Sequence, residues 1–330
     1  MITHVFNNGW GDMWEVKKFE KEILDEFLSR FIHDDCPTVI IHSTWYDNDY
    51  HKEILEKLKL ICPRRLVLVS MMDPSIVNKN WFDGLDYEIY CVGYYPGIGE
   101  IDAWALIVDR YFDLLSYPDV MDSTRIDKPY MCLNRKPHWH RMKFYHNLEN
   151  MDLLDFGIVS MGGNNGVPIR KLSLDSGISD IAPNSGKEQN GINNDICSLG
   201  HPDNWYRCFV NIVTETVWGI EQKYFVSEKI YKPIVGCRPF LVYDPNGAES
   251  WLVQRGFETF TKDFTDITDL DLTFPENIAP FIKVLCSQPV SYYRHKFVDL
   301  EEKISYNKSR FNQYCSEQKS RIRQGIICPT

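Results

Sequence analysis

The sequence predicts an α/β protein that consists of two doubly wound, parallel-sheet domains. Short apolar runs typical of buried strands alternate with longer segments in which apolar residues recur at helical spacing. This alternation occurs twice along the 330 residues, before and after a polar segment at residues 116–128 that contains Pro118. Because strands that alternate with helices form parallel βαβ units, both halves should be Rossmann-like.

The first domain is assigned to residues 1–120. Its clearest predicted helix is residues 16–31, where Phe19, Ile23 and Phe27 belong to an apolar stripe with mostly charged residues between them. Further helices are expected at residues 51–60 and 101–115, and strands at residues 39–41, 66–70 and 87–92.

The second domain is assigned to residues 121–290. Residues 162–204 are rich in Gly, Asn, Ser and Asp and are too long for an ordinary connection, which predicts a functional flap or a partly disordered segment. The tail, residues 291–330, has a polar helical pattern and is long enough to pack back across a neighbouring domain. Strands are expected at residues 130–133, 157–160, 209–213 and 240–243, and helices at residues 139–148 and from residue 227 onward.

Composition and charge exclude several classes of protein. The formal net charge is 36 minus 46, or −10, and the charges are interspersed, so no strong general affinity for nucleic acid is expected. No apolar run approaches the roughly 20 residues that cross a bilayer. The ten cysteines include no C-x-x-C pair, which is typical of reduced, buried thiols. We therefore expect a cytoplasmic protein without a membrane span.

The most informative segment is Ser227-Glu228-Lys229, at the expected beginning of a helix. Ser227 is a favoured N-cap residue, and Lys232 lies one turn further along the same face. The first turn of a helix leaves backbone N–H groups unpaired and carries the positive end of the helix dipole, so it favours an anion. A carboxylate beside it can accept hydrogen bonds from ribose hydroxyls. This combination predicts a site for a nucleoside diphosphate.

Two other strand ends of the second domain carry matching groups. Asn134, Arg135 and Lys136 follow its first expected strand, and Arg141 lies on the next helix. Arg is suited to phosphate because its guanidinium can form two parallel hydrogen bonds. Glu215 follows the third strand. Because open α/β sheets bind ligands at the carboxyl ends of their strands, we expect these residues to lie at a cleft between the two domains.

These segments resemble the donor half of the α-1,3-fucosyltransferases in their order and spacing. The resemblance covers roughly residues 129–245 and is most specific at Ser227-Glu228-Lys229. The other matching positions are Asn134, Arg141, Tyr145 and Leu148, then Leu154-Asp155-Phe156-Gly157, Asn164-Asn165-Gly166 and Thr214-Glu215-Thr216.

The resemblance implies a GT-B fold, in which two Rossmann-like domains face a cleft, and a glycosyltransferase of hexosyl or fucosyl type. It implies no metal, and no cofactor beyond a nucleotide-diphosphate sugar as co-substrate. By the same resemblance, Arg141 and Lys229 hold the pyrophosphate and act in catalysis, and Glu228 contacts the ribose. Thr216 stands where the family has Asn, which leaves the sugar open. The full expected donor-binding set is Asn134, Arg135, Arg141, Glu215, Ser227, Glu228, Lys229 and Lys232.

Inverting transfer needs a carboxylate base, which the first domain should supply, to remove the proton of the acceptor hydroxyl. Glu100 and Asp102 follow the glycine turn after the strand at residues 87–92, and Asp47 and Asp49 follow the strand at residues 39–41. Each of these is more often a helix cap or first-turn residue than a base. Glu100 is the preferred candidate.

Other interpretations stay open at this point. Asp47-Asn48-Asp49 also fits the metal-binding Asp-x-Asp of the other main glycosyltransferase fold. His138 and His140 do not predict zinc, because residues at i and i+2 diverge on a helix. The acceptor is a glycan, a protein or a modified base in DNA, and the last would make the protein a viral or phage hydroxymethylpyrimidine glycosyltransferase. A non-catalytic nucleotide- or glycan-binding protein would keep the same fold, with Trp45, Tyr46, Trp81 and Trp104 as candidate walls of the cleft.

Overall fold

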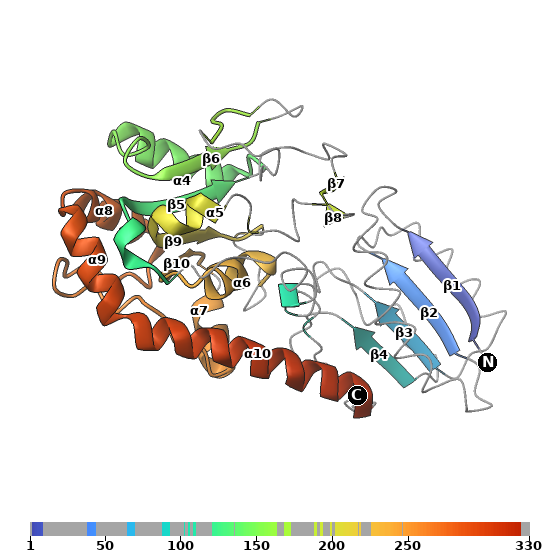
Figure 1. Ribbon diagram of the computed structural model, residues 1–330. Helices are drawn as coiled ribbons and strands as arrows, with labels where there is room; N and C mark the ends of the chain where they lie inside the picture. The colour runs from blue at the N-terminus through green and yellow to red at the C-terminus, as the bar shows by residue number, and fades with distance from the viewer. Residues whose placement is uncertain are drawn as a thin grey trace. The chain divides into compact units, whose positions relative to one another are not determined.

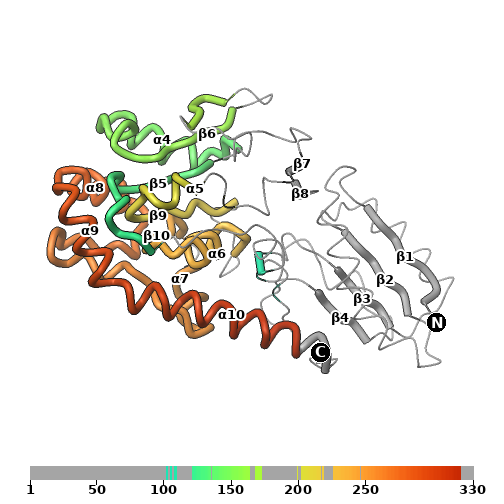
Figure 2. Tube along the Cα trace, in the orientation of Figure 1, coloured from blue at the N-terminus to red at the C-terminus, as the bar shows by residue number. Residues whose placement is uncertain are grey.

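The structure is a computed structural model of the 330-residue chain (Figures 1 and 2). The helices predicted at residues 16–31 and 51–60 lie outside the residues that it describes. It describes backbone and side chains at residues 102, 105, 108–109, 121–134, 136–163, 168–172, 199, 202–216, 218, 226–245 and 247–320, and the backbone alone at residues 2–8, 38–43, 65–69, 88–92, 188–189, 192–193 and 321–324.

Residue contacts divide the chain into two compact units, one of residues 1–107 and 315–330 and the other of residues 108–314. The second division falls within helix α10 (Glu301–Gln324), so the end of this helix belongs to the first unit. There, the backbone N–H of Asp102 donates a hydrogen bond to Gln318 Oε1 at 3.0 Å. The first division differs from the suggested limit at residue 120. The second differs from the suggested limit at residue 290, because a continuous helix carries no linker signal.

The first unit contains, among its described residues, a four-stranded parallel sheet with the order β1-β2-β3-β4. Its strands are β1 (Ile2–Asn8), β2 (Thr38–Ser43), β3 (Arg65–Val69) and β4 (Glu88–Val92). The last three confirm the predicted strands, whereas β1 is not predicted because Thr3, His4 and Asn7 interrupt its apolar residues. The reversal of strand order that defines a doubly wound sheet does not occur among these four strands.

The second unit contains a parallel sheet whose described strands have the order β10-β9-β5-β6. All four strands are predicted by the sequence. Their side chains are almost all buried, as expected for a parallel sheet that is covered on both faces. The strands are β5 (Lys128–Asn134), β6 (Ile158–Met161), β9 (Cys208–Thr214) and β10 (Phe240–Tyr243).

The order of this sheet reverses between β5 and β9. The chain leaves β5 through helix α4 (Trp139–Asn150) towards β6. It leaves β9 through helix α6 (Glu228–Val235) towards β10, which lies in the opposite direction. Ligands of open α/β sheets bind beside the carboxyl ends of the strands at such a reversal. The ends of β5 and β9 are therefore where this sheet favours a ligand.

Helices α4 and α6 confirm the predicted helices at residues 139–148 and after Ser227. Helices α8 (Pro275–Cys286) and α9 (Val290–Asp299) both contact β5, and α9 together with α10 forms the predicted helical tail (Figure 1). The sequence does not predict α8, nor the short helices α5 (Pro202–Arg207) and α7 (Ala248–Gln254), whose six and seven residues give too few turns for helical spacing to be recognised.

The long connection at residues 162–204 is described only in part. Within it, β7 (Glu188–Gln189) and β8 (Ile192–Asn193) form a short antiparallel pair, and Arg170 forms an isolated bridge with Met161. Its role as a flap stays a prediction.

Membrane and cysteine predictions can be compared with the described part of the chain. There, no helix combines the length and the hydropathy that a bilayer crossing requires. The cysteines described are free thiols, and Cys132, Cys208, Cys237 and Cys315 are buried. The cytoplasmic location stays a prediction.

Gly236, at the end of α6, packs directly against Trp205 of α5. A Cβ atom at Gly236 would lie 2.3 Å from Cε3 of this buried ring. The ring has little freedom to move, because its Nε1 donates a hydrogen bond to the carbonyl of Leu199 at 2.6 Å. Gly236→Ala should therefore lower the free energy of unfolding by about 1–3 kcal/mol, as measured by urea unfolding.

A matched variant tests the cause of this loss. Combining Gly236→Ala with Trp205→Leu should cost less than the sum of the two single changes, because the smaller side chain removes the clash. Strict additivity, or an unchanged stability of Gly236→Ala, would contradict the packing argument.

Candidate functional site

The side chains of Asn134 and Thr214 join the ends of β5 and β9. The Oγ1 of Thr214 donates a hydrogen bond to the Oδ1 of Asn134 at 2.5 Å. The backbone N–H of Asn134 donates to the Oγ of Ser160 on β6 at 3.3 Å. All three residues are buried. These contacts hold together the carboxyl ends of β5 and β9, where the strand order reverses. We call this side of the sheet its carboxyl edge.

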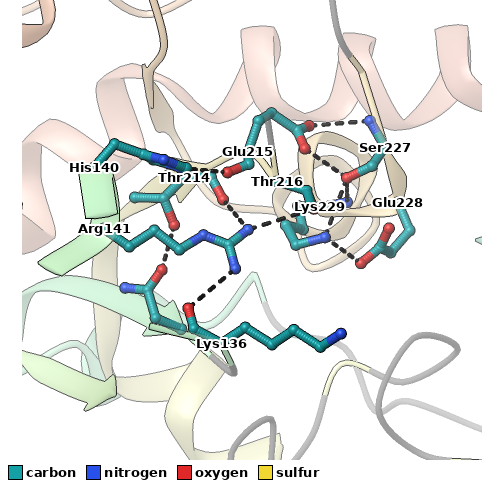
Figure 3. A network of polar contacts seen from close by, with 10 residues as sticks. Lys136, His140, Arg141, Thr214, Glu215, Thr216, Ser227, Glu228 and Lys229 are labelled. Carbon is teal, nitrogen blue, oxygen red and sulfur yellow. Dashed lines mark hydrogen bonds and ion pairs between the residues drawn. The ribbon is translucent and has the colours of Figure 1, made fainter. Parts of the chain in front are cut away.

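Arg141 reaches this edge from the first turn of α4. Its Nη2 donates to the carbonyl of Thr214 at 2.9 Å and approaches the Oγ1 of Thr216 at 3.5 Å, and its Nη1 approaches the carbonyl of Lys136 at 3.5 Å (Figure 3). The residue is buried. Because a guanidinium stays charged at all ordinary pH values, α4 places a permanent positive charge beside the ends of β5 and β9.

The first turn of α6 is held at the same edge by Glu215, the residue after β9. Ser227 caps the helix in an extended conformation, and its Oγ accepts from the backbone N–H of Lys229 at 3.5 Å, which confirms the predicted N-cap. Glu215 accepts a hydrogen bond from the backbone N–H of Ser227 at 3.1 Å and another from its Oγ at 2.5 Å. The end of β9 and the start of α6 are thus tied together (Figure 3).

Lys229 brings a second positive charge to the site. Its Nζ donates to the Oε1 of Glu228 at 2.6 Å and to the Oγ of Ser227 at 3.2 Å. The Lys229 side chain is 26% exposed, whereas that of Glu228 is 6% exposed. Burial lowers the pKa of Lys229, Glu228 and Glu215 oppose this effect, and the charge of Arg141 lowers the pKa further. The two cations therefore act on one region.

Glu215, which the sequence predicts as a donor-binding residue, is buried beside the start of α6. Both of its carboxylate oxygens are occupied by hydrogen bonds from Ser227, and the residue is buried. Burial raises the pKa of its carboxyl group, and the neighbouring Lys229 lowers it by a smaller amount. Glu215 is thus situated to hold α6 in position. Glu228 is the carboxylate that pairs with Lys229, whose side chain is more exposed than either glutamate.

The remaining predicted residues have mixed outcomes. Lys232 is buried one turn further along α6. Asp102 accepts a hydrogen bond from the backbone N–H of Ala105 at 2.9 Å, which confirms the interpretation of Asp102 as a cap. Arg135, Glu100 and the segment at residues 47–49 lie outside the described residues.

Some positions that carry the fucosyltransferase resemblance lie away from this edge. Tyr145 and Leu148 are buried on α4 as part of the core. Asp155 lies in the turn that precedes β6, at the amino ends of the strands, and forms an ion pair with Arg170 at 2.7 Å. Gly157 packs against the ring of Tyr130, and a Cβ atom added to Gly157 would lie 2.5 Å from Cζ of this ring. Asn164-Asn165-Gly166 lies outside the described residues.

Sequence reasoning missed the contribution of His140 and Trp218. The Nε2 of His140 donates to the carbonyl of Glu215 at 2.9 Å, and the ring of Trp218 stacks on the His140 ring with centroids 5.2 Å apart. The position of His140 next to Arg141 is the only hint of this role in the sequence. Among the described residues, no group of three metal-ligating side chains occurs.

Three comparisons with known proteins find no match. The sequence matches no family model and no curated protein, and no solved structure matches it. A function must therefore be argued from the geometry of this site.

Proposed function

We propose that the ends of β5 and β9 bind the diphosphate of a nucleotide sugar, and that the protein is a metal-independent glycosyltransferase of the GT-B type. The observation that carries this proposal is the convergence of Arg141, Lys229 and the first turn of α6 at the strand-order reversal. A permanent cation, an ammonium group and the positive end of a helix dipole together suit a diphosphate.

The same groups suit the leaving group of sugar transfer. In the inverting reaction, the acceptor hydroxyl attacks the anomeric carbon while the bond from this carbon to the diphosphate oxygen breaks. The diphosphate leaves with both electrons, and Arg141 and Lys229 would stabilise the charge that develops on it. Glu228, next to Lys229, would accept a hydrogen bond from a ribose hydroxyl.

The acceptor side of the proposal belongs to the first unit. In a GT-B enzyme, a second Rossmann-like domain binds the acceptor across a cleft from the donor, and Glu100 remains our candidate for the base that takes the acceptor's proton. The likeness to α-1,3-fucosyltransferases favours fucose or another hexose as the sugar. The acceptor stays open among a glycan, a protein and a modified base.

Thermal unfolding in the presence of nucleotides tests the donor site. Guanosine, uridine and adenosine diphosphates and their sugar conjugates are compared with and without EDTA. A ligand at roughly 100 times its Kd stabilises the folded protein by about 2.7 kcal/mol, so at least one nucleotide should raise Tm, and EDTA should not change the shift. A shift that requires added magnesium or manganese would refute metal independence. No shift with any nucleotide would refute the donor site.

A second measurement separates an enzyme from a protein that only binds. Water carries a hydroxyl that can attack the anomeric carbon in place of the acceptor when no acceptor is present. The nucleotide sugar that raises Tm should therefore be cleaved to nucleoside diphosphate and free sugar in proportion to the protein concentration. Binding without any cleavage, with or without candidate acceptors, would favour a non-catalytic nucleotide-binding protein.

A further inference from the structure

An aromatic cluster lies beside the proposed diphosphate site. Trp139 is the first residue of α4, two positions before Arg141, and Trp218 follows β9 two positions after Thr216. Both tryptophans therefore belong to the edge of the sheet that carries the two cations.

Contacts with His140 and Tyr243 hold the ring of Trp218 in position. The ring of Trp218 stacks on His140 and lies against the ring of Tyr243 of β10, with centroids 4.7 Å apart. His140 in turn donates its hydrogen bond to the carbonyl of Glu215. Glu215 therefore contacts both His140 of the aromatic cluster and Ser227 of the proposed diphosphate site, so the fold sets the relative positions of the two.

Trp139 is the exposed member of the cluster. Its ring contacts Trp218 and His140 edge to face, with centroids 5.7 Å apart in both cases. Even so, 61% of the residue remains exposed. These two ring contacts hold Trp139 in place, and its large exposed fraction leaves part of the ring accessible to a stacking partner.

Burial also disfavours a positive charge on the two histidines beside Trp139. Burial, together with the charges of Arg141 and Lys136, lowers the pKa of His138 to about 4. Burial likewise lowers the pKa of His140. An aromatic surface next to two cations matches the two parts of a nucleoside diphosphate, which has an aromatic base at one end and a charged diphosphate at the other.

We propose that Trp139, supported by Trp218, is the stacking surface for the nucleobase of the donor. This inference rests on the proposed function and adds the part of the ligand that Arg141 and Lys229 do not explain. Stacking is tolerant of base identity, so the surface would contribute affinity for any nucleoside diphosphate and little discrimination between bases.

Isothermal titration of guanosine diphosphate, uridine diphosphate, their sugar conjugates and inorganic pyrophosphate tests the inference, because pyrophosphate lacks the base. In the wild-type protein, at least one nucleotide should bind more tightly than pyrophosphate. Trp139→Ala should weaken nucleotide binding about tenfold or more and leave pyrophosphate binding unchanged. Trp139→Phe should restore most of the loss.

Phe156→Ala is the matched control. Phe156 is 50% exposed and lies just before β6, at the amino ends of the strands and so away from the proposed site. Its loss should change neither affinity.

Three results would overturn the inference while leaving the proposed function standing. These are an unchanged nucleotide affinity in Trp139→Ala, an equal loss for nucleotide and pyrophosphate, and a loss confined to the sugar conjugate. The last would mean that Trp139 contacts the transferred sugar. Failure of the wild-type protein to bind either nucleotide or pyrophosphate would overturn the proposed function, and this inference with it.

Discussion

Replacing Lys229 by methionine is expected to weaken the binding of both nucleoside diphosphate and inorganic pyrophosphate by roughly 10- to 150-fold. The range follows from the contribution of one hydrogen bond to a charged group, about 1.5–3 kcal/mol. Methionine keeps an unbranched chain in place of the lysine stem, so the packing at the start of α6 should survive. Isothermal titration at fixed ionic strength measures both affinities, and urea unfolding verifies that the variant is folded.

Lys303→Met is the matched control for this change. Lys303 has a similarly exposed side chain, 22%, and its Nζ lies 2.6 Å from Asp263, yet it belongs to α10 and takes no part in the site. Its replacement should leave both affinities unchanged. Glu228→Gln should weaken the binding of nucleotide and not that of pyrophosphate, because pyrophosphate has no ribose. Equal losses in Lys229→Met and Lys303→Met would refute the assignment of Lys229.

The elements nearest the site are the ones that the sequence predicts best. The helix at Ser227 is recognised because its cap is encoded locally, by one hydroxyl that accepts from an N–H two residues on. The strands β5, β9 and β10 are recognised because buried parallel strands are continuous apolar runs. Such signals are contained within a few residues and need no knowledge of which strands are neighbours.

Contacts between distant segments could not be predicted in the same way. The order β10-β9-β5-β6 depends on pairing, and no local pattern shows that β5 lies next to β9. The role of Glu215 depends on a partner 12 positions away, and the stacking of Trp218 on His140 joins residues of two different connections. A glutamate after a strand looks alike in sequence whether it meets a ligand or holds a helix.

The second large effect is expected at Glu215. Glu215→Ala should lower the free energy of unfolding by about 2–4 kcal/mol, because it leaves two buried donor groups of Ser227 without their acceptor. Nucleotide affinity should fall as well, since the first turn of α6 loses its tie to β9. A double-mutant cycle with Ser227→Ala, followed by urea unfolding, should show strong non-additivity. Additive losses would mean that the two side chains do not act together.

The pH dependence of stability distinguishes the charge of Glu215 from its hydrogen bonds. Burial raises the pKa of this carboxyl above its ordinary value of 4.5. Between these two pKa values the folded protein binds more protons than the unfolded chain, so this group makes the free energy of unfolding fall as the pH rises. Glu215→Gln lacks the titration, and its stability relative to wild type should therefore improve as the pH is raised from 4.5 towards neutrality. Parallel curves for the two proteins would contradict the raised pKa. Both oxygens of Glu215 accept hydrogen bonds from Ser227, so this acidic residue serves to fix the first turn of α6.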